Sequence, residues 1–309
     1  MLAFLGLNIK KNDVVIMPSI NFIAAYNVAR TIGANVFLSD VDKLTGQMTP
    51  KHLVECIKKF RIKKVKAILV QYHGGYPENI ENFYNLKKKL KCLLIEDACH
   101  AFGARYVINS KKYMIGSCKH SDICTFSFHP LKTITTGEGG AVTTNSKKID
   151  QKIKQLRSNG IIKNKKIWLN NSYFIGQNFN LTDFQCALGI SQLKKIDKFL
   201  KFRKKIFDQY NNQLKDLKKI KIVKYSKDIF PSYHLYLIHL LNSSIKEKEK
   251  FFKYMKKNKI NLMYHYIPLY KYKSFRGKYI KSESEKYYLS CFSLPIYYSL
   301  SIKKRNYII

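Results

Sequence analysis

One lysine lies in a sequence context suited to covalent chemistry. Lys132 occupies a loop between two apolar segments, 123–126 and 141–144, and both segments are predicted to be strands. Ser127 precedes the lysine by five positions, and a glycine-rich turn, 136–140, follows it. Open α/β sheets bind their ligands at the carboxyl ends of strands. A lysine held there with a partly neutral amine can form a Schiff base with a carbonyl compound.

Two carboxylates and a histidine end a second apolar segment. Glu96 and Asp97 close the segment that begins at Leu93, and His100 follows. Successive residues of a strand point to opposite faces of its sheet. Only one of the two carboxylates can therefore face the lysine, and charge alone does not decide which one does.

The elements that must position these groups alternate along the chain. The predicted strands are 35–39, 65–70, 92–95, 123–128 and 141–144. Predicted helices lie between them; they begin after Thr49, after Pro77 and after Thr144. A capping-box sequence at Thr182 opens a fourth helix. This alternation predicts an α/β fold with a mainly parallel sheet flanked by helices.

The chain is expected to divide into two domains. Residues 1–200 form the large domain, and a long helix predicted at 193–214 leads out of it. Residues 201–309 form a smaller α+β domain. The length of 309 residues suits this division.

Composition narrows the class of protein. The net charge of +37 is large, but the lysines are dispersed and arginine, the preferred reader of phosphates and bases, is scarce. We therefore do not expect a nucleic-acid partner. No apolar run is long enough to predict a membrane span. The seven cysteines lack metal-binding spacing, so we expect no metal, reduced thiols and a cytoplasmic location.

The two motifs, in this order, resemble those of the DegT/DnrJ/EryC1/StrS sugar aminotransferases, which are fold-type I enzymes dependent on pyridoxal 5'-phosphate (PLP). The similarity covers nearly the whole chain; beyond 93–104 and 127–141 it continues through 156–161, 178–189, 233–236, 265–268 and 293–295. Phe-His-Pro-x-Lys at 128–132 is most similar to the branch that aminates C4 of nucleotide-linked 4-keto sugars. The resemblance implies a UDP-sugar as amino acceptor and glutamate as amino donor.

The resemblance also assigns roles around the cofactor. It implies that Lys132 binds PLP covalently and that Asp97, rather than Glu96, keeps the pyridine nitrogen protonated. His100 would lie near the phenolic oxygen, Ser127 would bind the phosphate, and Phe22 would lie against the ring. Taken without the motif, an aromatic residue at position 22 would more often be a core residue.

Further residues are assigned to the substrate and to a second subunit. Asn178 matches an asparagine that reaches the cofactor phosphate of the partner, which implies a homodimer with shared active sites. Tyr264 and His265 match the segment near the sugar nucleotide, although aromatic packing is an equal alternative. Glu138 either contacts the substrate or only stabilises the turn 136–140, and the sequence does not distinguish the two roles.

The chain departs from the family pattern in places. The family carries an N-terminal segment with a phosphate-binding turn before the equivalent of Met1, so the sequence is expected to be N-terminally truncated. Asn21 and Asn180 replace the usual threonine and arginine. The alternative functions are a PLP-dependent 3-aminotransferase or dehydratase of nucleotide sugars, an inactive subunit that pairs with a full-length homologue, and a basic binding module. Lys132 argues against the dehydratase, because dehydratase relatives carry histidine there.

Overall fold

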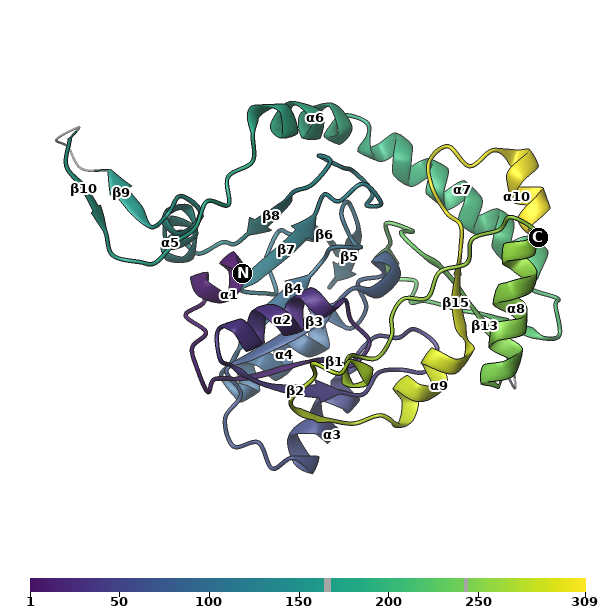
Figure 1. The fold of residues 1–309 in the computed structure, drawn as a ribbon, viewed down its shortest axis with the longest axis horizontal. Helices are drawn as coiled ribbons and strands as arrows, with labels where there is room; N and C mark the ends of the chain where they lie inside the picture. The colour runs from purple at the N-terminus through teal and green to yellow at the C-terminus, as the bar shows by residue number, and fades with distance from the viewer. Residues whose placement is uncertain (164–167, 242–243) are drawn as a thin grey trace.

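The computed structural model describes residues 1–163, 168–241 and 244–309. Its centre is a seven-stranded sheet (Figure 1). The strands run in the order β14 (Lys278–Tyr279), β2 (Asn35–Ser39), β1 (Val14–Pro18), β3 (Ala67–Gln71), β4 (Leu93–Asp97), β7 (Ile123–Ser127) and β8 (Gly140–Thr143). All neighbouring pairs are parallel except β7 and β8. The predicted mainly parallel sheet is therefore confirmed.

Helices pack on both faces of this sheet. The helices α3 (Pro50–Lys59) and α4 (Ile80–Leu90) contribute to one apolar core. The opposite core contains residues of α1 (Leu2–Gly6), α2 (Ile23–Thr31) and α5 (Lys147–Arg157). Within β4, Leu94 belongs to the first core and Ile95 to the second. This alternation along a strand buried on both faces produces the continuous apolar runs seen in the sequence.

One predicted helix starts later in the structure, and one central strand was not predicted. The helix predicted at 193–214 is α7 (Ile196–Leu214), which begins three residues later than expected because Leu193 is still the last residue of α6 (Asp183–Leu193). The strand β1 was not predicted; its short apolar run, buried over most of its length, carries no alternation to mark it. The other predicted strands and helices are present and begin within two residues of their expected starts.

The C-terminal part has its own core. The strands β11 (Ile220–Ile222), β13 (Tyr236–Leu240) and β15 (Cys291–Leu294) form an antiparallel sheet. Around it lie α7, α8 (Ile245–Lys257), α9 (Ser282–Ser290) and α10 (Ile302–Ile308). The proposed domain boundary at residue 200 falls inside α7, whose Ile206 and Tyr210 are fully buried in this core.

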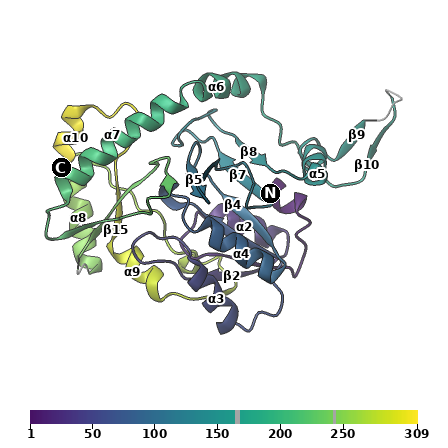
Figure 2. The same ribbon diagram turned by 180° about the vertical axis from the view of Figure 1, so that it is seen from behind.

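Smaller elements complete the chain. A third sheet joins β12 (Ile229–Phe230), β5 (Arg105–Ile108) and β6 (Lys111–Met114). The hairpin strands β9 (Ile161–Lys163) and β10 (Asn170–Ser172) extend away from the main body (Figure 2). Two 3-10 turns, η1 (His73–Gly75) and η2 (Leu269–Lys271), lie beside the central sheet. Over the described residues, no helix is long and apolar enough to span a membrane.

Candidate active site

The candidate site lies at the carboxyl ends of the central strands. Asp97 is the last residue of β4, Ser127 is the last residue of β7, and Phe22 opens α2 shortly after β1. Because parallel strands end at the same edge of a sheet, these residues converge there although more than a hundred positions separate the first from the last. Lys132 approaches the same edge from the loop after β7.

Lys132 is partly buried, and burial changes its chemistry. Desolvation lowers the pKa of the amine, and Cys99 and Asp97 nearby partly oppose this shift. The backbone N–H of Lys132 donates to the carbonyl of His129 at 2.9 Å, which folds the loop into a turn. A neutral fraction larger than that of an ordinary lysine makes this amine suited to attack a carbonyl.

Asp97 and Glu96 point to opposite sides of β4. The carboxyl of Glu96 accepts a hydrogen bond from the Tyr72 hydroxyl at 2.6 Å, and burial raises its pKa. Asp97 lies on the face shared with Lys132, and its Oδ1 accepts from the backbone N–H of Cys99 at 3.1 Å. Of the two carboxylates, only Asp97 therefore acts on the lysine electrostatically.

His100 belongs to a cluster of four histidines, of which three are buried and His265 is half-buried. Its ring centroid lies 4.3 Å from that of His234, 5.8 Å from that of His73 and 6.2 Å from that of His265. Burial lowers the pKa of each: that of His73 falls to about 3 and that of His265 to about 4. The cluster is therefore neutral at physiological pH and adds no positive charge near Lys132.

Several polar atoms at this edge are buried without a protein partner among the described residues. They include both ends of the Asn21 amide, Ser19 Oγ, Gln71 Oε1, and one ring nitrogen each of His73 and His234. Buried polar atoms are normally hydrogen-bonded to protein, water or ligand. Phe22, beside them, exposes 56% of its surface although it is a large apolar residue. The edge therefore has polar groups and an aromatic face available to a ligand.

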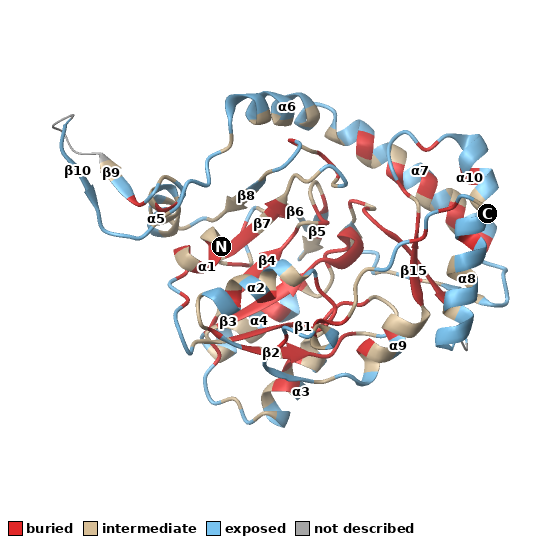
Figure 3. Cartoon of the chain, in the orientation of Figure 1, coloured by how far each residue is buried: buried red, intermediate tan, exposed pale blue. Residues whose placement is uncertain are grey.

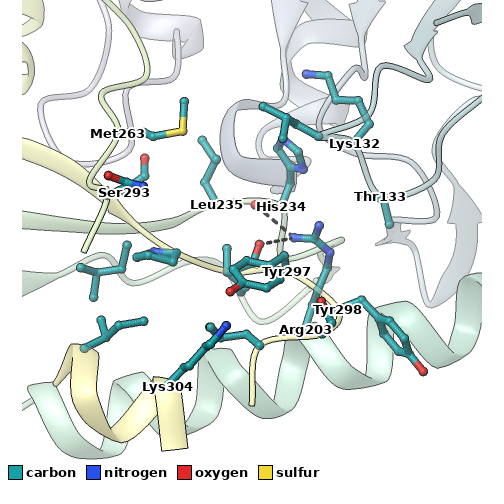
Figure 4. A pocket seen from close by; sticks show the side chains of 18 of the residues that line it. Lys132, Thr133, Arg203, His234, Leu235, Met263, Ser293, Tyr297, Tyr298 and Lys304 are labelled. Carbon is teal, nitrogen blue, oxygen red and sulfur yellow. Dashed lines mark hydrogen bonds between the residues drawn. The ribbon is translucent and has the colours of Figure 1, made fainter. Parts of the chain in front are cut away.

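A cavity of about 760 Å³ lies next to this edge. Lys132 and His234 line one end of it (Figure 4). His265, Arg203, Lys259 and Lys304 also line it. Tyr297 and Tyr298 supply aromatic surface. Asp97, His100 and Phe22 are not among its lining residues. Lys132 thus lies between the strand-end groups on one side and a partly basic cavity on the other.

Three predicted residues lie apart from this arrangement within the single chain. Tyr264 is about half-exposed and its ring packs near Phe252, not in the cavity. Glu138 is exposed; its backbone carbonyl accepts from Thr136 Oγ1 and Gln185 Nε2, so it supports the turn and the start of α6. Asn178 is exposed, and its Oδ1 accepts from the backbone and side-chain nitrogens of Asn180.

Other residues of the site were not singled out from the sequence. His73, Cys99 and Arg203 carry no local pattern that marks them, and Tyr266 was not separated from its neighbours. The Arg203 guanidinium donates from Nη1 to the carbonyls of Tyr233, His234 and Ile296 (Figure 4). The segment 233–236, already part of the family resemblance, was the one available signal for His234.

Comparison with known proteins identifies the family of this chain. The chain matches the DegT/DnrJ/EryC1/StrS aminotransferase family over residues 1–309. It belongs to that family. A Campylobacter jejuni protein named UDP-4-amino-4,6-dideoxy-N-acetyl-beta-L-altrosamine transaminase is 36% identical, with 99% of this chain and 80% of the relative covered. The Escherichia coli GDP-perosamine synthase is 31% identical over the same shares of the two chains.

Solved structures agree with the fold. The Helicobacter pylori aminotransferase PseC, described as involved in the biosynthesis of pseudoaminic acid, is 28% identical with a TM-score of 0.87 and covers 99% of this chain and 81% of its own. The TlmJ aminotransferase of Streptoalloteichus hindustanus superposes with a TM-score of 0.90 at 20% identity, covering 99% of this chain and 80% of its own. The chain is a sugar aminotransferase of nucleotide-sugar biosynthesis, and PLP is its cofactor.

The residues present suit PLP. The partly neutral Lys132 amine is suited to an aldehyde, and the Asp97 carboxylate is suited to a protonated pyridine nitrogen. Phe22 offers exposed aromatic surface at the same edge. The unpartnered polar atoms of Asn21 and Gln71 supply further hydrogen-bonding capacity at the same edge.

Proposed function

We propose that this enzyme transfers an amino group from glutamate to C4 of a UDP-linked 4-keto-6-deoxy sugar. Two relatives at 36% and 34% identity, both named as transaminases of a UDP-linked amino sugar, support the choice of substrate. One observation carries the proposed chemistry: a partly buried lysine whose pKa is lowered by desolvation lies beside a strand-end carboxylate. Without these two groups the fold alone would not specify a transaminase.

Each side chain has a defined task in this proposal. Lys132 would hold the cofactor through its aldehyde, and as a free amine it would take the proton from the α-carbon of glutamate. In the second half-reaction the same amine would deliver a proton to C4 of the sugar. Asp97 would hold a proton on the pyridine nitrogen. The bound cofactor supplies an electron-accepting ring, which stabilises the negative charge at the reacting carbon.

The remaining assignments concern binding. Ser127 would contact the cofactor phosphate, and Phe22 would lie against the ring. The half-buried His265, whose Nδ1 lies 2.8 Å from Ser293 Oγ, faces the cavity and would contact the sugar nucleotide. Lys259 and Lys304, which also line the cavity, would attract its diphosphate. Tyr264 and Glu138 are retained only as outer contacts of a bound substrate.

We also propose that the enzyme is a homodimer with shared active sites. Among its described residues α6 has no buried residue, although its sequence is largely apolar. Figure 3 shows α6 mostly in the colour of exposed residues. Phe184 exposes 91% of its surface and Ile190 exposes 58%. Exposed apolar surface of this kind is typical of an interface between subunits. Asn178 lies in the segment leading to α6, so an interface there would carry it toward the partner's cofactor.

The test begins with the purified chain, added PLP and borohydride. We expect an absorbance band that bleaches on addition of glutamate, and a peptide map that locates the reduced cofactor on Lys132. Lys132→Ala should abolish both the linkage and the transfer to a UDP-4-keto sugar. Lys51→Ala, which removes an amine from the exposed face of α3, is the matched control. Retention of the band and of amino transfer in Lys132→Ala would disprove the proposal.

A further inference from the structure

Both ring nitrogens of His100 are engaged within the protein. The backbone N–H of Gly74 donates to His100 Nδ1 at 3.3 Å. Nδ1 is therefore the acceptor nitrogen, and in a neutral imidazole the hydrogen must then be on Nε2. His100 Nε2 lies 2.8 Å from the Tyr266 hydroxyl, so the imidazole donates to the phenolic oxygen. His100 is 2% exposed and has no further N–H to offer a ligand.

The Tyr266 hydroxyl is consequently oriented as a donor. Its oxygen accepts from His100, which leaves its own hydrogen directed elsewhere. The side chain is only partly buried, and its ring centroid lies 5.8 Å from that of Phe22. Burial, reinforced by Asp97, raises the pKa of the hydroxyl above its ordinary value. Tyr266 therefore keeps its proton and presents it next to the residues that suit the cofactor.

Two hydrogen bonds fix the segment that carries Tyr266, and a third fixes the tyrosine that makes one of them. The Tyr287 hydroxyl donates to the carbonyl of the preceding residue, His265, at 2.7 Å, and its oxygen lies 2.8 Å from His73 Nε2. Leu269 N–H donates to the carbonyl of Ser19 at 2.9 Å. The hydroxyl is thus supported from α9 and from the loops after β1 and β3. Such support is what a preorganised hydrogen-bond donor requires.

We propose that Tyr266, not His100, donates a hydrogen bond to an oxygen of the bound ligand, and that His100 is a positioning residue that acts through Tyr266. The inference rests on the proposed function, because it assumes that the Lys132 edge holds the cofactor. The acceptor is an oxyanion, either the phenolic oxygen of PLP or a carboxylate oxygen of the amino donor. The family pattern instead implies that the residue at position 100 itself lies near the phenolic oxygen.

A double-mutant cycle separates the two assignments. Tyr266→Phe, His100→Ala and the double variant are compared with wild type and with Tyr254→Phe, which removes a hydroxyl from the exposed face of α8. We expect Tyr266→Phe to weaken PLP binding, or to raise KM for glutamate, by about 10- to 100-fold. Weaker PLP binding would identify the phenolic oxygen of the cofactor as the acceptor. A higher KM for glutamate would identify the carboxylate of the amino-donor substrate as the acceptor. The double variant should be no weaker than Tyr266→Phe alone.

Additive losses, or an unchanged Tyr266→Phe variant, would overturn the inference. A measurement on the apoprotein tests the positioning role even if His100→Ala misfolds or the proposed function is wrong. In ¹⁵N-histidine spectra of the apoprotein, His100 should carry its proton on Nε2. That proton should exchange at least about tenfold faster in Tyr266→Phe but not in Tyr254→Phe. A proton on Nδ1 would refute the positioning role, whereas absence of any Lys132–PLP linkage in wild type would refute only the proposed function.

Discussion

The reactivity of Lys132 is set by two opposing effects on one amine. Burial lowers its pKa, while Cys99 and Asp97 raise it. Reductive methylation followed by peptide mass spectrometry should therefore show half-maximal labelling of Lys132 below pH 10.5, the ordinary lysine value. Asp97→Asn removes a negative charge that stabilises the ammonium, so the midpoint should move to still lower pH. A midpoint that moves upward in Asp97→Asn would contradict this account of the site.

At this scale the sequence singled out two groups that the structure brings together, Lys132 and Asp97, but not the residues that surround them. Lys132 and Asp97 were singled out from local motifs. Strand alternation required only that one of Glu96 and Asp97 face away, and the family motif selected Asp97; the bond of Glu96 to Tyr72 agrees with that choice. The partners of His73 and His100 could not be predicted in this way. They are Tyr287 and Tyr266, which lie 214 and 166 positions away and meet them only through the tertiary fold.

Among the elements, the turn η1 after β3 controls the placement of His100. Gly75 has φ +92°, and a Cβ there would lie 2.0 Å from Ser232 Oγ and 2.7 Å from the carbonyl oxygen of His100. Gly75→Ala should therefore lower the free energy of unfolding by about 2–4 kcal/mol. Gly137→Ala, at φ +79° with nothing within 4 Å of the added carbon, should lower it by only about 1 kcal/mol. Guanidinium denaturation followed by circular dichroism measures both, and equal losses would show that crowding at Gly75 is relieved by movement of Ser232.

Elements with local signals were predictable, and those without were not. The helix α6 begins at the predicted capping box, since Thr182 and Gln185 exchange hydrogen bonds within one turn. The break between α6 and α7 has no comparable signal, because Lys194 and Lys195 are good helix formers. The turn η1 depends on close approach to Ser232, a residue far along the chain, so its glycines could not be interpreted from sequence alone.

For the whole molecule, buried histidines link stability to pH. His73, His100, His234, His239 and His265 all have pKa values lowered by burial; those of His239 and His265 fall to about 4 and that of His73 to about 3. Below pH 6.5 the unfolded chain binds protons that the folded chain does not, so stability decreases as the pH falls from 6.5 toward 4. Each histidine contributes about 1.4 kcal/mol per pH unit over that interval. Denaturation midpoints measured at pH 7.5, 6.5 and 5.5 test this. The midpoint should fall only slightly between pH 7.5 and 6.5 and much more between pH 6.5 and 5.5.

The proposed association of two subunits through the exposed face of α6 can be tested by substitution. The double variant Phe184→Lys/Ile190→Lys puts two charges on a face that we propose is buried against a second copy, and burying an unpaired charge is strongly unfavourable. We expect light scattering coupled to size-exclusion chromatography to report a dimer for wild type and a dissociation constant at least about 100-fold higher for the variant. Ile302→Lys alters an apolar residue of similar exposure, 65%, on α10 and should leave the dimer intact. Because Asn178 would reach the partner's cofactor only across this interface, the α6 variant should also bind PLP more weakly. A monomer in wild type, or loss of the dimer in Ile302→Lys instead, would contradict the proposed interface.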